Sequence, residues 1–258
     1  MSQPSVKRKL AKNQVSLGAW ITIGHPAVAE IMAQSGFDWL AIDMEHAAIT
    51  LAQAQTLIQV IELSGGTPLV RVGENDPRLI KQVLDAGAHG VIVPMVNTAA
   101  EASRAVDAVY YPPQGKRGVG LARAQKYGLG FEAYKKWLPR EAILVAQIEH
   151  CAAVENLEDI LAVKGIDATL IGPYDLSASM GYPGEFERPA VKAMIQQYIQ
   201  TCRRLKKTAG FHSVPPDPLL AQRKIKEGFA FLGFSLDELF LAQSLKDALQ
   251  KLHAADRK

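Results

Sequence analysis

The chain has 258 residues, 48% of them hydrophobic and 21% charged, which is the composition of an ordinary globular protein with a sizeable core. A net charge of +3, without a clustered basic stripe, does not indicate nucleic-acid binding. No run of about 18 apolar residues occurs and the first fourteen residues are polar and basic, so we expect neither secretion nor membrane insertion. Because Cys151 and Cys202 are the only cysteines and cannot form a disulfide framework, a reducing cytoplasm is the expected location.

Short apolar runs alternate with amphipathic segments along the whole chain. Eight of these runs are predicted strands: Leu17 to Ile23, Trp39 to Met44, Pro68 to Val72, Gly90 to Val96, Ile143 to Glu149, Ala168 to Gly172, Ala209 to Val214 and Ala230 to Ser235. Helical patterns that end at a glycine lie between several of them, such as Ala27 to Ser35 and Pro77 to Ala86. Eight such units in about 250 residues predict a single α/β domain over residues 1–258, a (β/α)8 TIM barrel, with a doubly wound open sheet as the alternative.

Two further segments depart from this alternation. Residues 110–137, rich in glycine and aromatic residues, separate the fourth and fifth predicted strands, and we interpret them as a long functional loop. The final amphipathic segment, Leu236 to Leu252, could cover the barrel or reach a neighbouring subunit.

Two carboxylates follow consecutive predicted strands. Glu149 ends the segment VAQIEH and Asp175 lies in IGPYDLSASMG, so both are expected on the same rim of a parallel sheet. Hard oxygen ligands in this arrangement suggest a divalent metal, whereas a helix-capping role is the alternative for each acid taken alone.

Other polar side chains are expected at the same rim, where the active sites of such barrels lie. Arg71 follows an apolar run and could bind a carboxylate through its planar guanidinium, or it could form a structural ion pair with Glu74 or Asp76. His46 could be a general base or a packed histidine. Asp85 lies in a helical pattern, where an exposed acid is the default interpretation.

Several catalytic classes find no support in the sequence. GKRGVG at 115–120 matches neither nucleotide-binding glycine motif. No nucleophile elbow occurs, and no lysine lies at a predicted strand end to form a Schiff base. The pattern therefore favours a metal over an imine as the electron sink.

Five motifs together resemble one known family, the class II, metal-dependent pyruvate aldolases, which include 4-hydroxy-2-oxoheptanedioate and 2-keto-3-deoxy-sugar-acid aldolases. They are GFDWLAIDMEHA, LVRVGENDPRLIKQVLDAGAHGVIVPMV, YYPPQGKRGVG, QIE and IGPYDLSASMG, and the resemblance runs from about Leu17 to Leu252. It implies a barrel of the phosphoenolpyruvate/pyruvate-binding type, with the C-terminal helix exchanged between the subunits of a homo-oligomer, a hexamer or trimer. It also implies an aldehyde-lyase that cleaves or forms 4-hydroxy-2-keto acids, taking a 2-keto acid and an aldehyde as its small-molecule partners.

The resemblance also implies a role for each matching residue. Glu149 and Asp175 would hold Mg²⁺, Mn²⁺ or Co²⁺, and Arg71 would steady the enolate oxygen. His46, paired with Asp85, would act as the base. The remaining matches would line the substrate pocket, with Arg117 and Arg123 near it: Trp20, Gln147, Gly172 and Pro173.

The sequence departs from the family pattern at Met44 and at FHSVPPDP, residues 211–218. His212 could therefore be a substrate ligand or a packed histidine. An alternative function is a metal-dependent lyase or condensing enzyme that acts on a dicarboxylate in a biosynthetic pathway.

Overall fold

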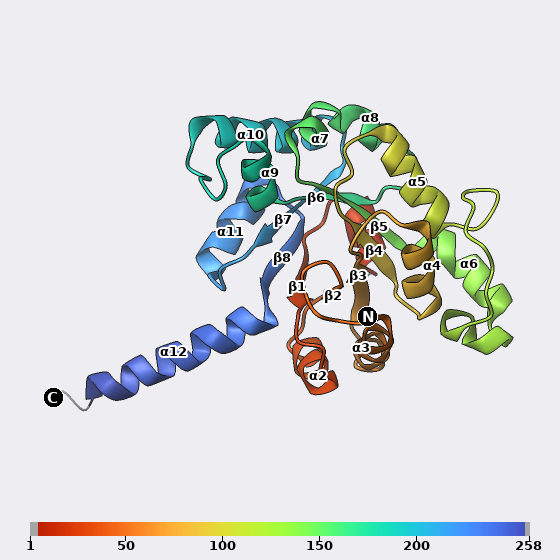
Figure 1. The fold of residues 1–258 in the computed structure, drawn as a ribbon, viewed down its shortest axis with the longest axis horizontal. Coiled ribbons are helices and arrows are strands. Elements are labelled where there is room, and N and C mark those ends of the chain that lie inside the picture. Colours follow the sequence, from red (N-terminus) through yellow and green to blue (C-terminus); the bar gives the residue numbers. More distant parts are fainter. Residues whose placement is uncertain (1–4, 256–258) are drawn as a thin grey trace.

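Eight parallel strands close into one barrel in the computed structural model, which describes residues 5–255 (Figure 1). The strands are β1 (Ser16–Ile21), β2 (Trp39–Asp43), β3 (Thr67–Arg71), β4 (Gly90–Val93), β5 (Ile143–Ile148), β6 (Ala168–Ile171), β7 (Thr208–Ser213) and β8 (Phe231–Leu236). Each strand pairs with its neighbours in the chain, and β1 pairs with β8 to complete the ring. The predicted TIM barrel is confirmed and the open sheet is excluded.

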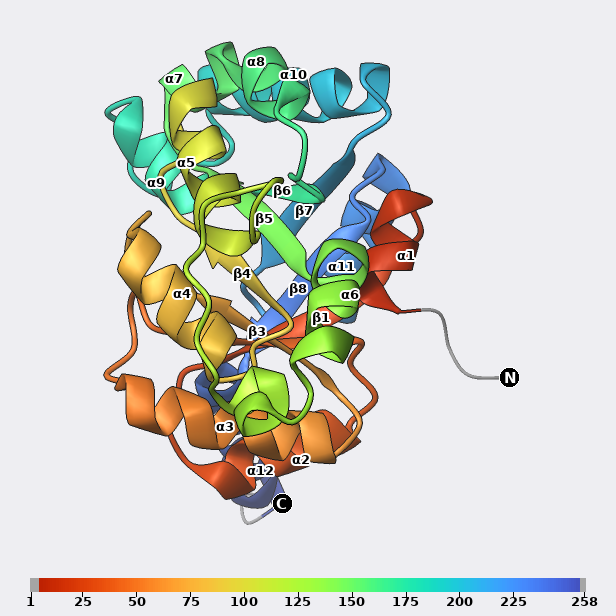
Figure 2. The ribbon, with the colours of Figure 1, turned by 90° about the vertical axis from the view of Figure 1, so that its right-hand side faces the viewer.

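Helices alternate with the strands along the chain, and most of them cover the outside of this barrel (Figure 2). They are α1 (Val6–Ala11), α2 (Pro26–Gln34), α3 (Leu51–Leu63), α4 (Pro77–Asp85), α5 (Ala99–Val109), α6 (Phe131–Glu141), α7 (Cys151–Glu155), α8 (Leu157–Ala162), α9 (Pro173–Ser179), α10 (Pro189–Arg204), α11 (Pro218–Glu227) and α12 (Asp237–Ala255), with a 3₁₀ segment, η1, at Arg123–Gly128. None of these helices is long and apolar enough to cross a bilayer.

Strand alternation divides the core into two parts. Inward-facing side chains of the strands, among them Trp39, Leu69 and Phe231, fill the barrel interior. Outward-facing residues pack under the helices in a second, larger cluster. Charged side chains such as Asp43 and Arg71 lie at the carboxyl ends of the strands, so this end of the barrel forms the polar mouth.

The short helix α1 was absent from the predicted elements because half of its six residues are basic and its apolar pattern is short. Val6 and Leu10, one helical turn apart, are buried against the residues of the barrel interior. Thr208 at the start of β7 donates a hydrogen bond to the Leu10 carbonyl over 2.7 Å. These contacts place α1 at the amino ends of the strands, opposite the mouth.

The segment 110–137 is only partly the loop that was predicted. Its last residues belong to α6, whose buried Tyr134 and Leu138 anchor it. In η1, Lys126 and Tyr127 both adopt left-handed backbone conformations, with φ of 49° and 55°. The packing of α6 therefore anchors the end of this segment, and η1 contains a turn with two left-handed residues.

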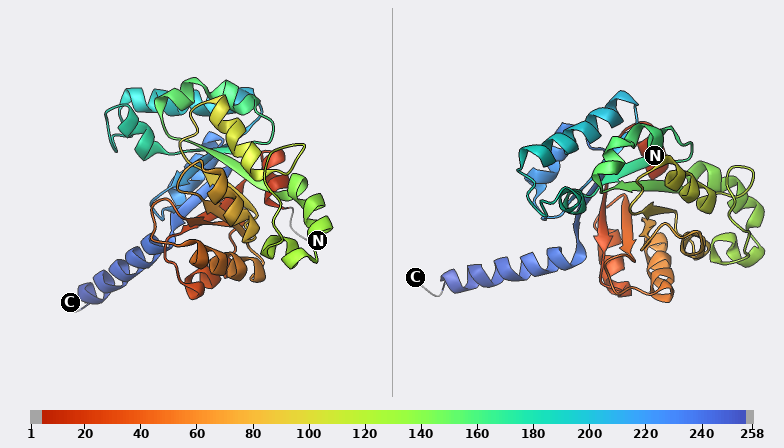
Figure 3. Two further views of the ribbon diagram at one scale, coloured as in Figure 1. Left: turned by 45° about the vertical axis from the view of Figure 1, so that its right-hand side comes forward. Right: turned by 45° about the horizontal axis from the view of Figure 1, so that its top comes forward.

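Helix α12 projects away from the barrel (Figures 1 and 3). Four leucines at helical spacing are more than half exposed along it: Leu241, Leu245, Leu249 and Leu252. An unpartnered apolar face of this kind marks an interaction surface.

Candidate active site

Arg71, the last residue of β3, is held by two acids that follow β2. Its Nε and one terminal nitrogen donate to the two carboxylate oxygens of Asp43 over 3.0 and 2.6 Å. Glu45 Oε2 lies 3.3 Å from the same Nε. The alternative partners considered from the sequence, Glu74 and Asp76, do not make this pair. The fork geometry fixes the plane of the guanidinium.

Asp43, the last residue of β2, is not among the predicted catalytic, substrate-binding or metal-binding residues. It is buried, and its Oδ1 also accepts the backbone N–H groups of Glu45 and His46 over 3.0 and 3.2 Å. Burial raises the pKa of Asp43, but the hydrogen bond and charge of Arg71 outweigh burial and hold that pKa below its ordinary value. Asp43 is therefore a fixed anion that positions Arg71 and the turn after β2.

Trp20 lies beneath Arg71. The guanidinium carbon is 4.3 Å from the centroid of the indole ring, a cation–π arrangement. Trp20 thus contributes a flat, buried surface beneath the cation.

Glu149 lies just beyond the end of β5 and is buried. It accepts hydrogen bonds from the backbone N–H of Met95, over 2.7 Å, and from the side-chain amide of Gln147. Burial raises the pKa of Glu149, and the nearby charge of Asp175 raises it further. Met95 reaches this position in a left-handed conformation with φ of 52°, and such strain is found where a site depends on the backbone.

Asp175 lies in the first turn of α9, which begins directly after β6 and Gly172. A Cβ atom on Gly172 would lie 3.0 Å from Oε2 and from Cβ of Glu149. The glycine therefore keeps the space in which the Glu149 carboxylate sits. Pro173, buried at the helix start, holds this turn in place.

Glu45 completes a group of three carboxylates. Burial raises its pKa to about 7, and the charges of Glu149, Asp43 and Asp175 add to this rise, while Arg71 opposes it. Although its Oε2 lies 3.3 Å from Arg71 Nε, this oxygen accepts no hydrogen bond from any of residues 5–255. No three His, Cys, Asp or Glu side chains form a ready-made ligand cluster within residues 5–255. The three acids nevertheless fit a divalent cation. A positive charge among them would offset the repulsion between their carboxylates and would give Glu45 Oε2 a ligand to contact.

His46 is exposed at the mouth, with Nε2 3.6 Å from Glu45 Oε2. Asp85, the predicted partner of His46, does not contact it. Asp85 ends α4, a nine-residue helix that starts beside the mouth and so carries its last residue about 13 Å away along its axis. Its carboxylate instead accepts hydrogen bonds from Arg117, over 2.6 Å, and from Gln125, over 3.3 Å. The pair does not form within one chain.

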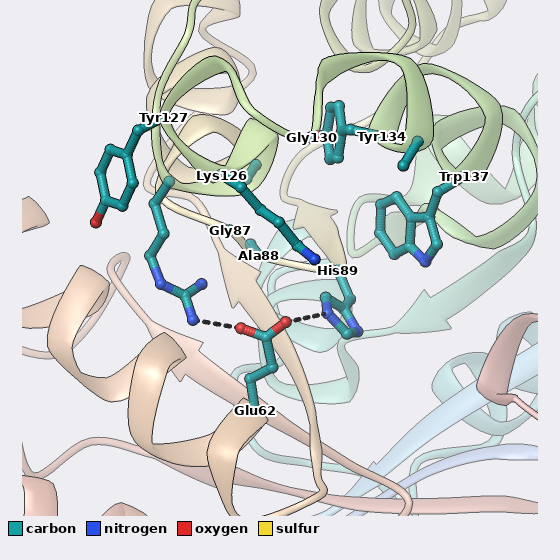
Figure 4. A pocket seen from close by; sticks show the side chains of 12 residues that line it. Glu62, Gly87, Ala88, His89, Lys126, Tyr127, Gly130, Tyr134 and Trp137 are labelled. Carbon is teal, nitrogen blue, oxygen red and sulfur yellow. Dashed lines mark hydrogen bonds and ion pairs between the residues drawn. The ribbon is translucent and has the colours of Figure 1, made fainter.

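The two arginines of the 110–137 segment are also not at the mouth of their own barrel. Arg117 is buried against Asp85 and Tyr134. Arg123 pairs with Glu62 at the end of α3, and Glu62 also lies 3.5 Å from His89 (Figure 4). The hydrogen bond from His89 and the charge of Arg123 lower the pKa of Glu62 to about 2 despite its partial burial. The expectation that both arginines lie near the substrate pocket is wrong for the single chain.

Comparison with known proteins agrees with this architecture. Residues 16–243 match the HpcH/HpaI aldolase/citrate lyase family. The 2-keto-3-deoxy-L-rhamnonate aldolase of Escherichia coli is 40% identical over 245 residues, which cover 94% of this chain and 91% of that protein. The chain belongs to the HpcH/HpaI aldolase/citrate lyase family, and the predicted family and enzyme class, a carbon–carbon lyase, are confirmed.

Solved structures are similar over nearly the whole chain. A family member from Burkholderia cenocepacia superimposes with a TM-score of 0.92 at 29% identity, covering 97% of this chain and all of that one. The citrate synthase SbnG superimposes with a TM-score of 0.87 at 26% identity, covering 99% of this chain and all of that one. One barrel thus serves both carbon–carbon cleaving and condensing relatives.

Proposed function

We propose that the protein is a divalent-metal-dependent aldolase that cleaves or forms 4-hydroxy-2-keto acids, yielding a pyruvate-type enolate and an aldehyde. The observation that carries this proposal is the bidentate Arg71–Asp43 pair beside the three acids Glu45, Glu149 and Asp175. A fixed cation next to an anionic oxygen-ligand set is the arrangement needed to bind and polarise a 2-keto acid.

Glu149 and Asp175 would hold the cation, which we propose to be Mg²⁺, Mn²⁺ or Co²⁺. Their oxygen donors suit a hard ion. When bound, the ion supplies Lewis-acid stabilisation of the charge that develops on the keto oxygen. Burial of Glu149 and its hydrogen bonds to Met95 and Gln147 fix the carboxylate before any ion arrives.

Arg71 would donate to the keto oxygen, where negative charge collects as the C3–C4 bond breaks. The electron pair of that bond becomes the enolate, the C4 carbon becomes the aldehyde carbonyl, and the C4 hydroxyl loses its proton. A donor already oriented by Asp43 needs little reorganisation at that moment, which is why such groups accelerate reactions. Trp20, Gln147, Gly172 and Pro173 would line the space around the keto acid.

His46 would take the C4 hydroxyl proton, since its imidazole is exposed at the mouth and can meet a bound substrate. In our proposal Asp85 still pairs with His46, but only if a second copy of the chain supplies it. This requirement fits the proposed homo-oligomer, a hexamer or trimer in which the exposed leucine face of α12 packs on a neighbour. A single domain over residues 1–258 and a cytoplasmic location also remain part of the proposal.

A panel of 4-hydroxy-2-keto acids tests this function. Pyruvate release coupled to lactate dehydrogenase should be abolished by EDTA and restored by Mg²⁺ or Mn²⁺. The Glu149→Gln variant should stay inactive after the ion is restored. Undiminished release in EDTA would contradict the metal-dependent aldolase.

A second candidate is a condensing enzyme acting on a dicarboxylate, which the similarity to the citrate synthase SbnG favours. Incubation with oxaloacetate and with each aldehyde of the panel, followed by product mass spectrometry, separates the two. Condensation with oxaloacetate as the faster reaction would favour this candidate.

A further inference from the structure

His212 extends the stack formed by Trp20 and Arg71. It lies on β7, paired in register with Gly233 of β8, and its ring centroid is 5.3 Å from that of Trp20, with the planes inclined by 57°. Trp20 in turn lies beneath the Arg71 guanidinium. His212 is therefore next to the part of the substrate that Arg71 would bind, the keto-acid end.

Two polar atoms in this stack are unsatisfied. Trp20 Nε1 and His212 Nε2 are both shielded from solvent and have no hydrogen-bond partner in the described part of the chain. A buried donor or acceptor without a partner costs free energy, so a ligand that pairs with both atoms would be favoured at this place. A Cβ on Gly233 would lie 3.2 Å from Trp20 Nε1 and 3.4 Å from Cδ2 of His212, so both rings border the same space.

A bulge in the barrel wall shapes this corner. Between Gly18 and Trp20 on β1, the paired residues on β8 advance from Gly233 to Leu236, so β8 carries one extra residue. Ser235 there has a left-handed conformation with φ of 58°. Bulges of this kind redirect side chains next to active sites.

The imidazole of His212 is neutral. Burial and the charge of Arg71 lower its pKa to about 3, despite a hydrogen bond with the Ser235 backbone and the opposing charge of Asp43. With the ring proton on the nitrogen that faces the Ser235 carbonyl, Nε2 is an acceptor. The indole N–H is a donor. One donor beside one acceptor matches a hydroxyl group, which can both accept and donate.

We propose that Trp20 and His212 recognise a hydroxyl group on the carbon next to the keto group, so that the favoured keto-acid fragment is hydroxypyruvate rather than pyruvate. This inference rests on the proposed aldolase function. The methyl group of pyruvate would leave both polar atoms unmatched. His212 also lines, with Pro173 and Ser213, a cavity of about 580 Å³.

Enolate formation tests the inference without knowledge of the aldehyde. In D₂O with Mg²⁺, a base removes a C3 proton, the enolate forms, and a solvent deuteron returns to C3. Proton NMR follows this exchange for hydroxypyruvate and for pyruvate separately, with the rate in buffer and Mg²⁺ alone subtracted. We expect wild-type enzyme to exchange hydroxypyruvate at least about tenfold faster per enzyme than pyruvate.

His212→Leu should lower the ratio of the two rates about tenfold or more, and His212→Gln, whose amide restores an acceptor, should recover part of it. Trp20→Phe, which deletes the indole N–H but keeps a ring under Arg71, should lower the ratio too and serves if the His212 variants do not fold. Asp107→Asn, at an exposed ion pair on α5, is the control and should keep the wild-type ratio.

The ¹⁵N resonance of His212 Nε2, assigned by its loss in His212→Leu, supplies a readout independent of turnover. It should show an unprotonated nitrogen that shifts on adding hydroxypyruvate and not pyruvate. Pyruvate preferred by the wild type, or a ratio unchanged in both His212→Leu and Trp20→Phe, would overturn the inference. Exchange of neither acid would instead contradict the proposed aldolase.

Discussion

Asp43 and Arg71 form the central ion pair of the site, with two hydrogen bonds of 3.0 and 2.6 Å between neighbouring strand ends. The register of the barrel aligns them, because residue 43 of β2 pairs directly with residue 71 of β3. The pair therefore follows from the register of two neighbouring strands, and the orientation of Arg71 depends on a residue that need not touch the substrate.

Asp43→Asn should lower kcat more than it raises KM, since a neutral amide cannot hold the guanidinium bidentately. A loss of one preorganised oxyanion donor typically costs about 10² to 10³ in kcat. Steady-state kinetics on the best substrate measures the split. Asp107→Asn, at an exposed ion pair on α5, is the control; a raised KM with normal kcat in Asp43→Asn would show that Arg71 only anchors substrate.

Gly172→Ala should weaken metal binding. The added methyl group would lie 3.0 Å from the Glu149 carboxylate and would displace it. Calorimetric titration with Mn²⁺ should show at least about a tenfold loss of affinity, since a coordination geometry tolerates little displacement. Gly118→Ala, where a Cβ meets no atom within 4 Å, is the matched control. Equal affinities in the two variants would argue against Glu149 as a ligand.

The metal-free protein should lose stability as pH rises from about 4.5 to about 7. The pKa of Glu45 is raised to about 7 by burial and by neighbouring acids, so the folded state binds more protons than the unfolded state in this window. The loss should be at most roughly 3 kcal/mol. Urea denaturation at several pH values measures it, and Glu45→Gln should flatten the slope. An unchanged slope in that variant would assign the effect to another group.

Asp85→Ala and His46→Ala should each be nearly inactive, yet mixed oligomers refolded from both chains should regain activity. The reason is that Asp85 and His46 do not meet within one chain, so an active pair in the mixture would use one residue from each. Activity of the separate and co-refolded variants measures this. No recovery in confirmed mixed oligomers would return Asp85 to a structural role with Arg117.

Leu245→Asp with Leu249→Asp should dissociate the oligomer, because both side chains belong to the exposed apolar face of α12. Two charges would make burial of that face unfavourable. Sedimentation velocity gives the mass directly. Gln243→Glu with Gln250→Glu, polar positions of the same helix, controls for added charge. A wild-type mass in the leucine variant would place the subunit contacts elsewhere.

The barrel could be predicted from the sequence because its signals are local. Each strand is a short apolar run, each helix has a matching period, and glycines such as Gly87 and Gly228, with φ of 105° and 102°, end two of the helices. Parallel pairing then brings the carboxyl ends of all strands to one face. The positions of Arg71, Gln147 and Glu149 at the mouth followed from this alone.

Which groups touch one another was decided by the tertiary structure. Glu74 and Asp76 lie near Arg71 in the sequence, yet the register of β2 and β3 places Asp43 beside it. The length of α4 places Asp85 away from His46 and beside the buried Arg117. The pairing of β1 with β8 closes the ring across more than 200 residues and creates the bulge beside Trp20 and His212. Periodicity specifies the face on which a side chain lies, whereas only the closed barrel specifies its neighbours across that face.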